Sequence, residues 1–277
     1  MIPSSVSVIP LAHKPRVDEQ PHNTMPTSSR RKLIKQFGAA IGITVAGLPL
    51  TVAANPTAQL KVVVTGGHPD DPETGCGGLI ALLTAAGHEV TIAYLTRGEA
   101  GIAGVSHNEA AAIRTQEAER ANKLLGSNPL FMGQIDGDTY VNAAAYQKTF
   151  DLLSAEGPDL LLTHWPIDTH RDHRSCSMLT YNAWLRMEKK PDLYFYEVVS
   201  GGQTQNFAPT NFVDISAVRA TKHEACFAHE SQNVAKQYPK DHGKMEEFRG
   251  MESGHPYAEA FVRHWWNPRQ IAELKHQ

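Results

Sequence analysis

One stretch of the chain decides the fold class: it spans residues 61–78 and reads KVVVTGGHPDDPETGCGG. Its first five residues are rich in β-branched side chains, which predicts a buried strand that ends at Gly66-Gly67. The glycines at the end of the stretch lead into an apolar segment, 79–83, which predicts a helix that ends near Gly87. A strand followed closely by a helix is the repeating unit of a parallel β-sheet.

The same alternation continues along the chain. Apolar periodicity predicts further strands at 89–95, around Leu130, at 159–163 and at 193–199, with helices at 108–125, 143–155 and 173–187. Short connections between these elements predict one α/β domain, a mostly parallel sheet covered by helices on both faces. In such a sheet, ligands bind at the loops that follow the carboxyl ends of the strands.

Composition excludes several classes of protein. The 277 residues are 41% hydrophobic with only three cysteines, which excludes a disordered chain, a collagen-like repeat and a disulfide-stapled miniprotein. The net charge of −3 provides no basic field, so no nucleic-acid partner is expected. The chain has 14 histidines, and their positions matter more than their number.

The N-terminal region, 1–54, has the pattern of a disordered leader followed by an export signal. Paired arginines, Arg30-Arg31, precede a weakly apolar run over 37–54 that ends in small residues suited to signal cleavage. This pattern predicts a twin-arginine-type signal, export to the periplasm or outside the cell, and a folded domain over 55–277. Met25 is an alternative start. A membrane anchor or a buried helix is the other interpretation, but glycines and a proline interrupt the run. No stable membrane span is expected after signal removal.

The cysteines do not define a site. Cys76, Cys176 and Cys226 are an odd number for an oxidising compartment, and whether any two form a disulfide stays open. None belongs to a CxxC pair, which argues against a zinc site built from cysteines.

The first cluster of ionisable residues follows the first predicted strand directly: His68, Asp70 and Asp71. Carboxylates at this position would repel a phosphate, so a dinucleotide site is excluded on charge. A histidine and an aspartate at a strand end are ligands that zinc prefers. The alternative is a solvated acidic turn in which an aspartate caps the next helix. The adjacent histidine and the glycine-rich helix start favour the metal site.

A second cluster, HWPIDTHRDHR at 164–174, follows the strongest predicted strand. It holds three histidines and two aspartates, and a polar loop at the start of a helix is the alternative interpretation. Because parallel strands end at the same edge of a sheet, we expect the two clusters to meet. Three protein ligands with an open position form a catalytic zinc site.

These two clusters resemble the signature motifs of the PIG-L (LmbE-like) family of zinc-dependent N-acetylglucosaminyl de-N-acetylases. The family's motifs are His-Pro-Asp-Asp-Glu before a glycine-rich helix start, and His-x-Asp-His. The resemblance extends over 61–232 through further matches, which are Thr96–Gly101, Arg114–Glu117, Asp136-Gly137, Val213–Ile215, Lys222 and Ala228–Gln232. One departure is Pro72, which replaces the family's acidic residue after Asp-Asp, while Glu73 keeps the next acidic position.

The resemblance implies a Rossmann-like three-layer sandwich and a hydrolase that removes the N-acetyl group from an N-acetylglucosamine-type sugar or glycoconjugate. It implies one Zn²⁺ per chain held by His68, Asp71 and His173, with another divalent metal left open. Asp70 would be the general base for a metal-activated water.

The resemblance also implies that His170 stabilises the developing oxyanion and is oriented by Asp172. Arg114 is expected either to contact substrate or to form an internal ion pair, and His229 to line the pocket. The remaining histidines are interpreted as surface or packing residues, namely His88, His107, His223, His242, His255, His264 and His276.

Two alternatives remain at this stage. A metallo-β-lactamase-type hydrolase carries His-x-His-x-Asp-His, but Asp168 stands where its first histidine belongs. A non-catalytic metal- or sugar-binding protein is the other, and a homo-oligomer stays open. The segment 233–277 is a candidate to close one side of the pocket. The aromatic residues are interpreted as core rather than as a sugar-stacking face, namely Trp165, Tyr194, Phe195, Tyr196, Trp265 and Trp266.

Overall fold

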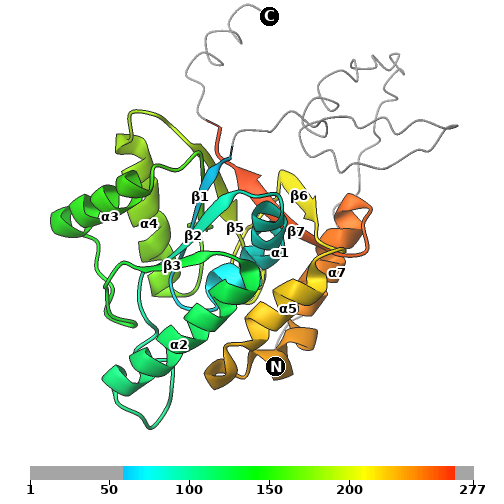
Figure 1. Cartoon of the computed structure of the whole chain (residues 1–277), viewed down its shortest axis with the longest axis horizontal. Coiled ribbons are helices and arrows are strands. Elements are labelled where there is room, and N and C mark those ends of the chain that lie inside the picture. The colour runs from blue at the N-terminus through cyan, green and yellow to red at the C-terminus, as the bar shows by residue number, and fades with distance from the viewer. Residues whose placement is uncertain (1–58, 266–277) are drawn as a thin grey trace, which may run out of the picture. The chain divides into compact units, whose positions relative to one another are not determined.

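The computed structural model describes residues 59–265, which all belong to the predicted domain. A seven-stranded sheet with the order β3-β2-β1-β4-β5-β7-β6 forms its centre (Figure 1). The strands are β1 (Lys61–Gly66), β2 (Glu89–Tyr94), β3 (Asn128–Phe131), β4 (Leu160–His164), β5 (Asp192–Tyr196), β6 (Asn211–Asp214) and β7 (Ala258–Arg263). The leader and signal predicted for 1–54 lie outside the described residues, as do Trp266 and His276.

The first five strands in spatial order are parallel. β1 pairs with β2 on one side and with β4 on the other, and Val62, Val63 and Val64 are buried because both faces of the sheet are covered. Val62 and Val64 pack into one hydrophobic cluster, while Val63 packs into another on the opposite face. Successive side chains of a strand point to opposite faces of the sheet, so the core is divided into two layers.

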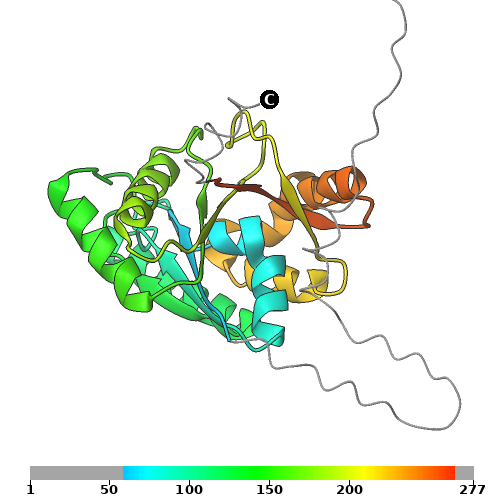
Figure 2. The same ribbon diagram turned by 90° about the horizontal axis from the view of Figure 1, so that it is seen from above.

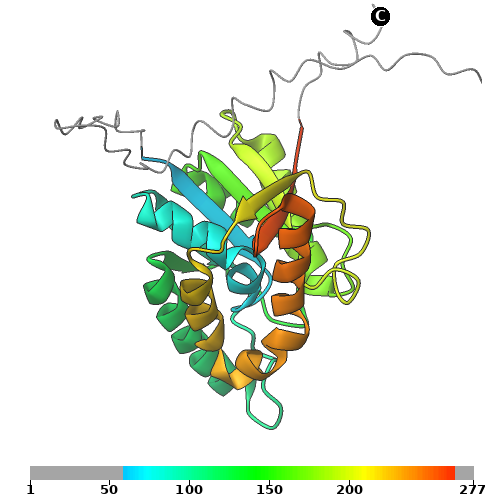
Figure 3. The same cartoon turned by 90° about the vertical axis from the view of Figure 1, so that its right-hand side faces the viewer.

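Helices cover both faces of the sheet. Figures 2 and 3 show α3 and α4 on one face, and α1, α2, α5 and α7 on the other. The bounds are α1 (Asp71–Ala85), α2 (His107–Leu125), α3 (Ala143–Glu156), α4 (Arg171–Arg186), α5 (Arg219–Phe227), α6 (Val234–Gln237) and α7 (His242–Ser253), with short 3₁₀ turns η2 (Glu230–Gln232) and η3 (Tyr238–Lys240). The predicted α/β class with a mostly parallel sheet is confirmed.

One edge of the sheet differs from the prediction. β7 runs antiparallel to both β5 and β6, and the sequence patterns did not predict β6, β7 or the helices between them. The last predicted strand is also shorter than expected, since β5 ends at Tyr196. The other predicted strands and helices are present, and α2 ends at Gly126 in the left-handed conformation that glycine favours.

Cys76, Cys176 and Cys226 are buried and free, so no two of them form a disulfide. Phe195 and Tyr196 are core residues, as interpreted, whereas Trp265 is exposed. Within 59–265, no helix combines the length and apolar character needed to cross a membrane.

Candidate active site

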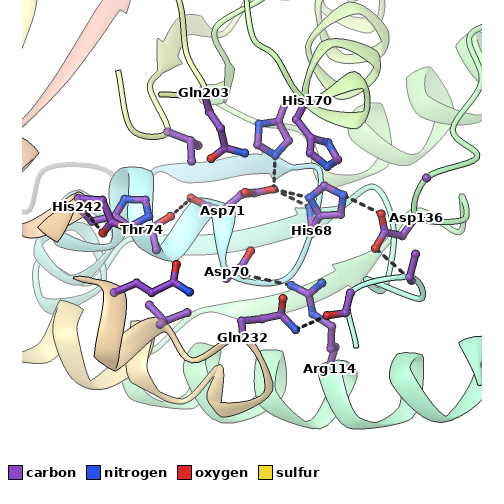
Figure 4. Close-up of a pocket in the computed structure, with 18 of the residues that line it drawn as sticks. His68, Asp70, Asp71, Thr74, Arg114, Asp136, His170, Gln203, Gln232 and His242 are labelled. Atoms are coloured by element: carbon purple, nitrogen blue, oxygen red, sulfur yellow. Dashed lines mark hydrogen bonds and ion pairs between the residues drawn. The ribbon is translucent and has the colours of Figure 1, made fainter. Parts of the chain in front are cut away.

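The two sequence clusters meet at one edge of the sheet. β1 and β4 are parallel neighbours, so the loops that follow Gly66 and His164 emerge together. They form the floor of a pocket of about 610 Å³, drawn in Figure 4. All of the predicted metal and catalytic residues except Asp172 line this pocket.

Asp71 is the centre of the arrangement. Its Oδ2 atom lies 3.1 Å from His68 Nδ1, 3.2 Å from His173 Nε2 and 3.5 Å from His164 Nε2. Burial alone would raise the pKa of the Asp71 carboxyl, but the charge on His173 and the hydrogen bonds from the surrounding imidazoles hold it well below its ordinary value. Asp71 is therefore a carboxylate.

Further carboxylates contact His68 and His173 at the ring nitrogens that do not face Asp71. His68 Nε2 lies 3.1 Å from Asp172 Oδ2 and 3.2 Å from Asp136 Oδ1, and His173 Nδ1 lies 3.3 Å from Asp168 Oδ1. Burial would lower the pKa of His173, but Asp71 and Asp168 raise it to about 9. Histidines that bind a metal commonly direct the other ring nitrogen to a carboxylate in this way.

This donor set fits a divalent cation. His68, His170 and His173 offer nitrogen atoms within 4.8 Å of one another, and so do the ligand atoms of Asp71, His164 and His173. Asp71 contacts both His68 and His173, so the predicted triad combines members of the two groups. Nitrogen and carboxylate oxygen from three residues are the usual ligands of a catalytic zinc ion.

Asp70 faces different partners. Arg114 Nη2 lies 3.1 Å from Asp70 Oδ2 and donates to Pro69 O at 2.5 Å, so Arg114 forms the internal ion pair and also lines the pocket. Burial raises the pKa of Asp70 to about 6, against the opposing charge of Arg114. The backbone of Asp70 has φ 114°, a conformation that costs about 1–3 kcal/mol for a residue with a side chain.

Asp172 does not orient His170 in the way that was expected. Its carboxylate contacts His68, Thr139 Oγ1 at 2.5 Å and the Gly137 N–H at 2.8 Å. The two side chains diverge because α4 begins at Arg171, and residues two apart on a helix do not share a face. Asp172 therefore holds His68.

The backbone fixes His170 instead. The Asp172 N–H donates to His170 Nδ1 at 3.3 Å, and burial, with the nearby charges of His68 and His173, lowers the pKa of His170. A neutral ring that accepts at Nδ1 carries its proton on Nε2. His170 thus retains an Nε2–H donor in the pocket lining.

The structure places two histidines differently from the expectation. His229 does not line the pocket, since it is fully buried with Nε2 3.2 Å from Glu73 Oε1. His242, interpreted as a surface or packing residue, does line the pocket. It belongs to the C-terminal segment, whose described part closes one side of the pocket as expected, through Val234, Gln237, Asp241 and His242.

Sequence reasoning also missed Asp136 as a site residue, although the family motif included it. Asp136 lines the pocket and contacts His68. The signal was its position in the loop after β3, at the same edge of the sheet.

Pro72 fits the start of the helix that follows Asp70. It lies in the first turn of α1, where the backbone N–H has no partner within the helix and proline is well tolerated. Its ring occupies the space beside Gly66, where an added Cβ would lie 2.5 Å from Pro72 Cγ.

Comparisons with known proteins identify the family of the chain. A family model described as PIG-L, GlcNAc-PI de-N-acetylase, matches residues 63–184. A protein named diacetylchitobiose deacetylase, from Thermococcus kodakarensis, is 30% identical over 223 residues, which cover 72% of this chain and 81% of the relative.

Solved structures share the fold. N,N'-diacetylchitobiose deacetylase from Pyrococcus horikoshii superposes with a TM-score of 0.67 at 24% identity, covering 76% of this chain and 86% of that one. The conserved protein TT1542 from Thermus thermophilus gives 0.65 at 29% identity, with 76% and 98% covered.

The fold and site define an α/β hydrolytic enzyme with a cluster of residues that could hold a metal ion at the carboxyl edge of its sheet. The chain belongs to the PIG-L family of de-N-acetylases. The prediction of an N-deacetylase enzyme is thereby confirmed, and the metallo-β-lactamase alternative is set aside.

Proposed function

We propose that this enzyme is a zinc-dependent hydrolase that removes the N-acetyl group from an N-acetylglucosamine-type sugar or glycoconjugate. The observation that carries the proposal is that two adjacent carboxylates have different surroundings. Asp71 lies among imidazoles, whereas Asp70 lies beside them in the pocket. The similarity to a protein named diacetylchitobiose deacetylase supports the choice of substrate class.

His68, Asp71 and His173 would hold the zinc ion, which supplies Lewis acidity toward the amide carbonyl and makes water a better nucleophile. Asp70 takes a proton from the attacking water as the general base. It can then return that proton to the departing nitrogen, so the products are acetate and a free amine. Arg114 keeps Asp70 in place through the ion pair at Oδ2.

His170 stabilises the negative charge that develops on the carbonyl oxygen. Because His170 Nδ1 accepts from the backbone N–H of Asp172, its Nε2–H is free to donate to that oxygen. Because the ring is neutral, it donates a hydrogen bond without competing for the proton that Asp70 carries.

The rest of the pocket is suited to a polar ligand. Among the described residues that line it, none is Phe, Tyr or Trp, and three glutamines do line it, Gln203, Gln232 and Gln237. Amide groups can both donate to and accept from sugar hydroxyls. We expect recognition through hydrogen bonds rather than through stacking on an aromatic ring.

Export by the twin-arginine route remains part of the proposal, carried by the Arg30-Arg31 pattern. A folded protein that already holds its metal suits that route. The test is the location of the full chain and of an Arg30→Lys, Arg31→Lys variant, which is expected to stay in the cytoplasm.

Acetate release tests the activity. The zinc-loaded protein is offered N-acetylglucosamine, N,N'-diacetylchitobiose and, as a control amide, N-acetylglycine. We expect equal amounts of acetate and free amine from at least one sugar and none from N-acetylglycine. A fully metallated protein that releases no acetate from any sugar would overturn the proposal and favour the binding-protein alternative.

A further inference from the structure

A fully buried carboxylate lies directly behind Asp70. Glu73 Oε1 accepts a hydrogen bond from Tyr94 OH at 2.5 Å and lies 3.2 Å from His229 Nε2. Its other oxygen, Oε2, accepts from the backbone N–H of Asp70 at 3.2 Å. Groups from the loop before α1, from β2 and from the loop after α5 therefore converge on Glu73.

The contact with Asp70 is made where the backbone is strained. At φ 114°, Asp70 adopts a conformation that side chains disfavour, and such a residue keeps it only when its surroundings impose it. The backbone dihedrals of a residue set the direction in which its side chain leaves the chain. Glu73 therefore acts on the direction of the Asp70 carboxylate without touching the pocket, since it is not among the lining residues.

Helix α2 holds both Asp70 and the loop that carries His229. Arg114, on α2, contacts the Asp70 carboxylate, while Glu117, one turn further on, accepts from the N–H of Ser231 at 2.8 Å and from its Oγ at 2.7 Å. Ser231 follows His229 closely in the chain, so α2 also fixes the loop that carries His229 against Glu73.

We propose that Glu73, supported by Tyr94 and His229, is a positioning residue that holds Asp70 in its strained conformation and aims its carboxylate at the reacting water. This inference rests on the proposed function, because it takes Asp70 to be the general base. Loss of Glu73 should let the Asp70 backbone relax, so the base would be displaced while the metal ligands and the substrate contacts remain.

The chain contains a matched control. Glu246 on α7 is also a buried carboxylate, which accepts from Tyr238 OH at 2.6 Å and lies 3.2 Å from His223 Nε2. Its other partners are Lys222 and Arg219, and Glu246 is not among the residues that line the pocket. The two clusters thus share a tyrosine donor and a histidine contact. Glu246 also pairs with Lys222 and Arg219, whereas Glu73 accepts from the Asp70 N–H.

The experiment compares Glu73→Ala with Glu246→Ala, using zinc-loaded protein and the sugar that the wild type deacetylates best. We expect Glu73→Ala to lower kcat by about 10²-fold, the effect of a misplaced catalytic group, with KM and bound zinc unchanged. Glu73→Gln should recover most of kcat, because its amide oxygen can still accept from the Asp70 N–H. Glu246→Ala should keep the wild-type kcat.

A second pair decides the question where an alanine variant fails to fold. Tyr94→Phe removes the hydroxyl donor to Glu73, and Tyr238→Phe removes the matching donor to Glu246. Only Tyr94→Phe should lower kcat. Equal losses in both pairs, a loss of zinc in Glu73→Ala, or a change in KM alone would overturn the positioning role. An inactive wild type would instead overturn the proposed function.

Discussion

Asp70 and Asp71 are consecutive carboxylates with different surroundings. Asp71 lies among His68, His164 and His173, and its pKa is held well below the ordinary value. Asp70 lies beside one guanidinium, that of Arg114, and burial raises its pKa to about 6. Neighbours in the chain have thus acquired opposite titration behaviour.

The difference fits the roles proposed for the two aspartates. A carboxylate that stays charged is suited to hold a cation, whereas one with a pKa near neutrality can take up and release a proton. The assignment depends on the direction of each side chain, which the strained backbone at Asp70 helps to determine. Substitutions of Asp70 and of Asp71 should therefore have different effects on metal binding and on catalysis.

The largest effect is expected from Asp71→Ala. Removing the oxygen that His68 and His173 share should abolish zinc binding and lower kcat/KM by at least about 10³-fold, since the charge stabilisation it supports is lost. Acetate release provides the measurement. Asp192→Asn, at an exposed carboxylate at the start of β5, is the control and should retain full activity.

Asp70→Asn should leave a folded protein with little activity. Asparagine has nearly the same shape and tolerates positive φ, but it cannot accept a proton. We expect kcat to fall by about 10²–10⁴-fold with KM nearly unchanged. Steady-state kinetics on the preferred sugar measure this, and a variant that keeps half of its kcat would contradict the role of Asp70.

The third effect is a shift in pH dependence. Because the base must be ionised, activity should fall as the pH drops through the pKa of Asp70, raised to about 6 by burial. Arg114 lowers that pKa, so Arg114→Gln should move the acidic limb of the kcat profile up by about one pH unit. An unmoved limb would show that another group controls it.

The smallest effect on activity is expected at Glu246. Glu246→Gln should leave kcat unchanged but lower the free energy of unfolding by about 3–5 kcal/mol, because Lys222 loses a buried partner. Burial would raise the pKa of Glu246, but the charge of Lys222 and the hydrogen bonds that Glu246 accepts hold this pKa well below its ordinary value.

The pH dependence of that loss has a definite sign. A carboxylate with a lowered pKa in the folded state stabilises the fold above its unfolded pKa, and this contribution fades as the pH falls through the folded pKa. The difference between the wild type and Glu246→Gln should therefore be full at pH 7 and shrink below about pH 4. Denaturant titrations at several pH values measure it, and a constant difference would contradict the assignment.

The parallel half of the sheet was predictable because its signals are local. β-Branched runs such as 61–65 and a terminal glycine such as Gly126 determine strands and helix ends within a few residues. The antiparallel edge was not predictable, since β7 carries a buried Glu259 whose partner, Lys222, lies far away in the chain.

The site, too, was predictable only in part. Strand ends brought His68, Asp71 and His173 together as expected. The direction of Asp172, however, depends on where α4 begins, and the place of His242 depends on how the C-terminal segment folds back. Neither leaves a signal in the sequence around these residues.

The metal content of Asp70→Asn and Asp71→Asn, purified side by side and loaded with zinc, distinguishes the two carboxylates. We expect one zinc ion per chain in Asp70→Asn, as in the wild type, and almost none in Asp71→Asn. Equal zinc in the two variants, whether bound or lost, would contradict the division of roles between these carboxylates.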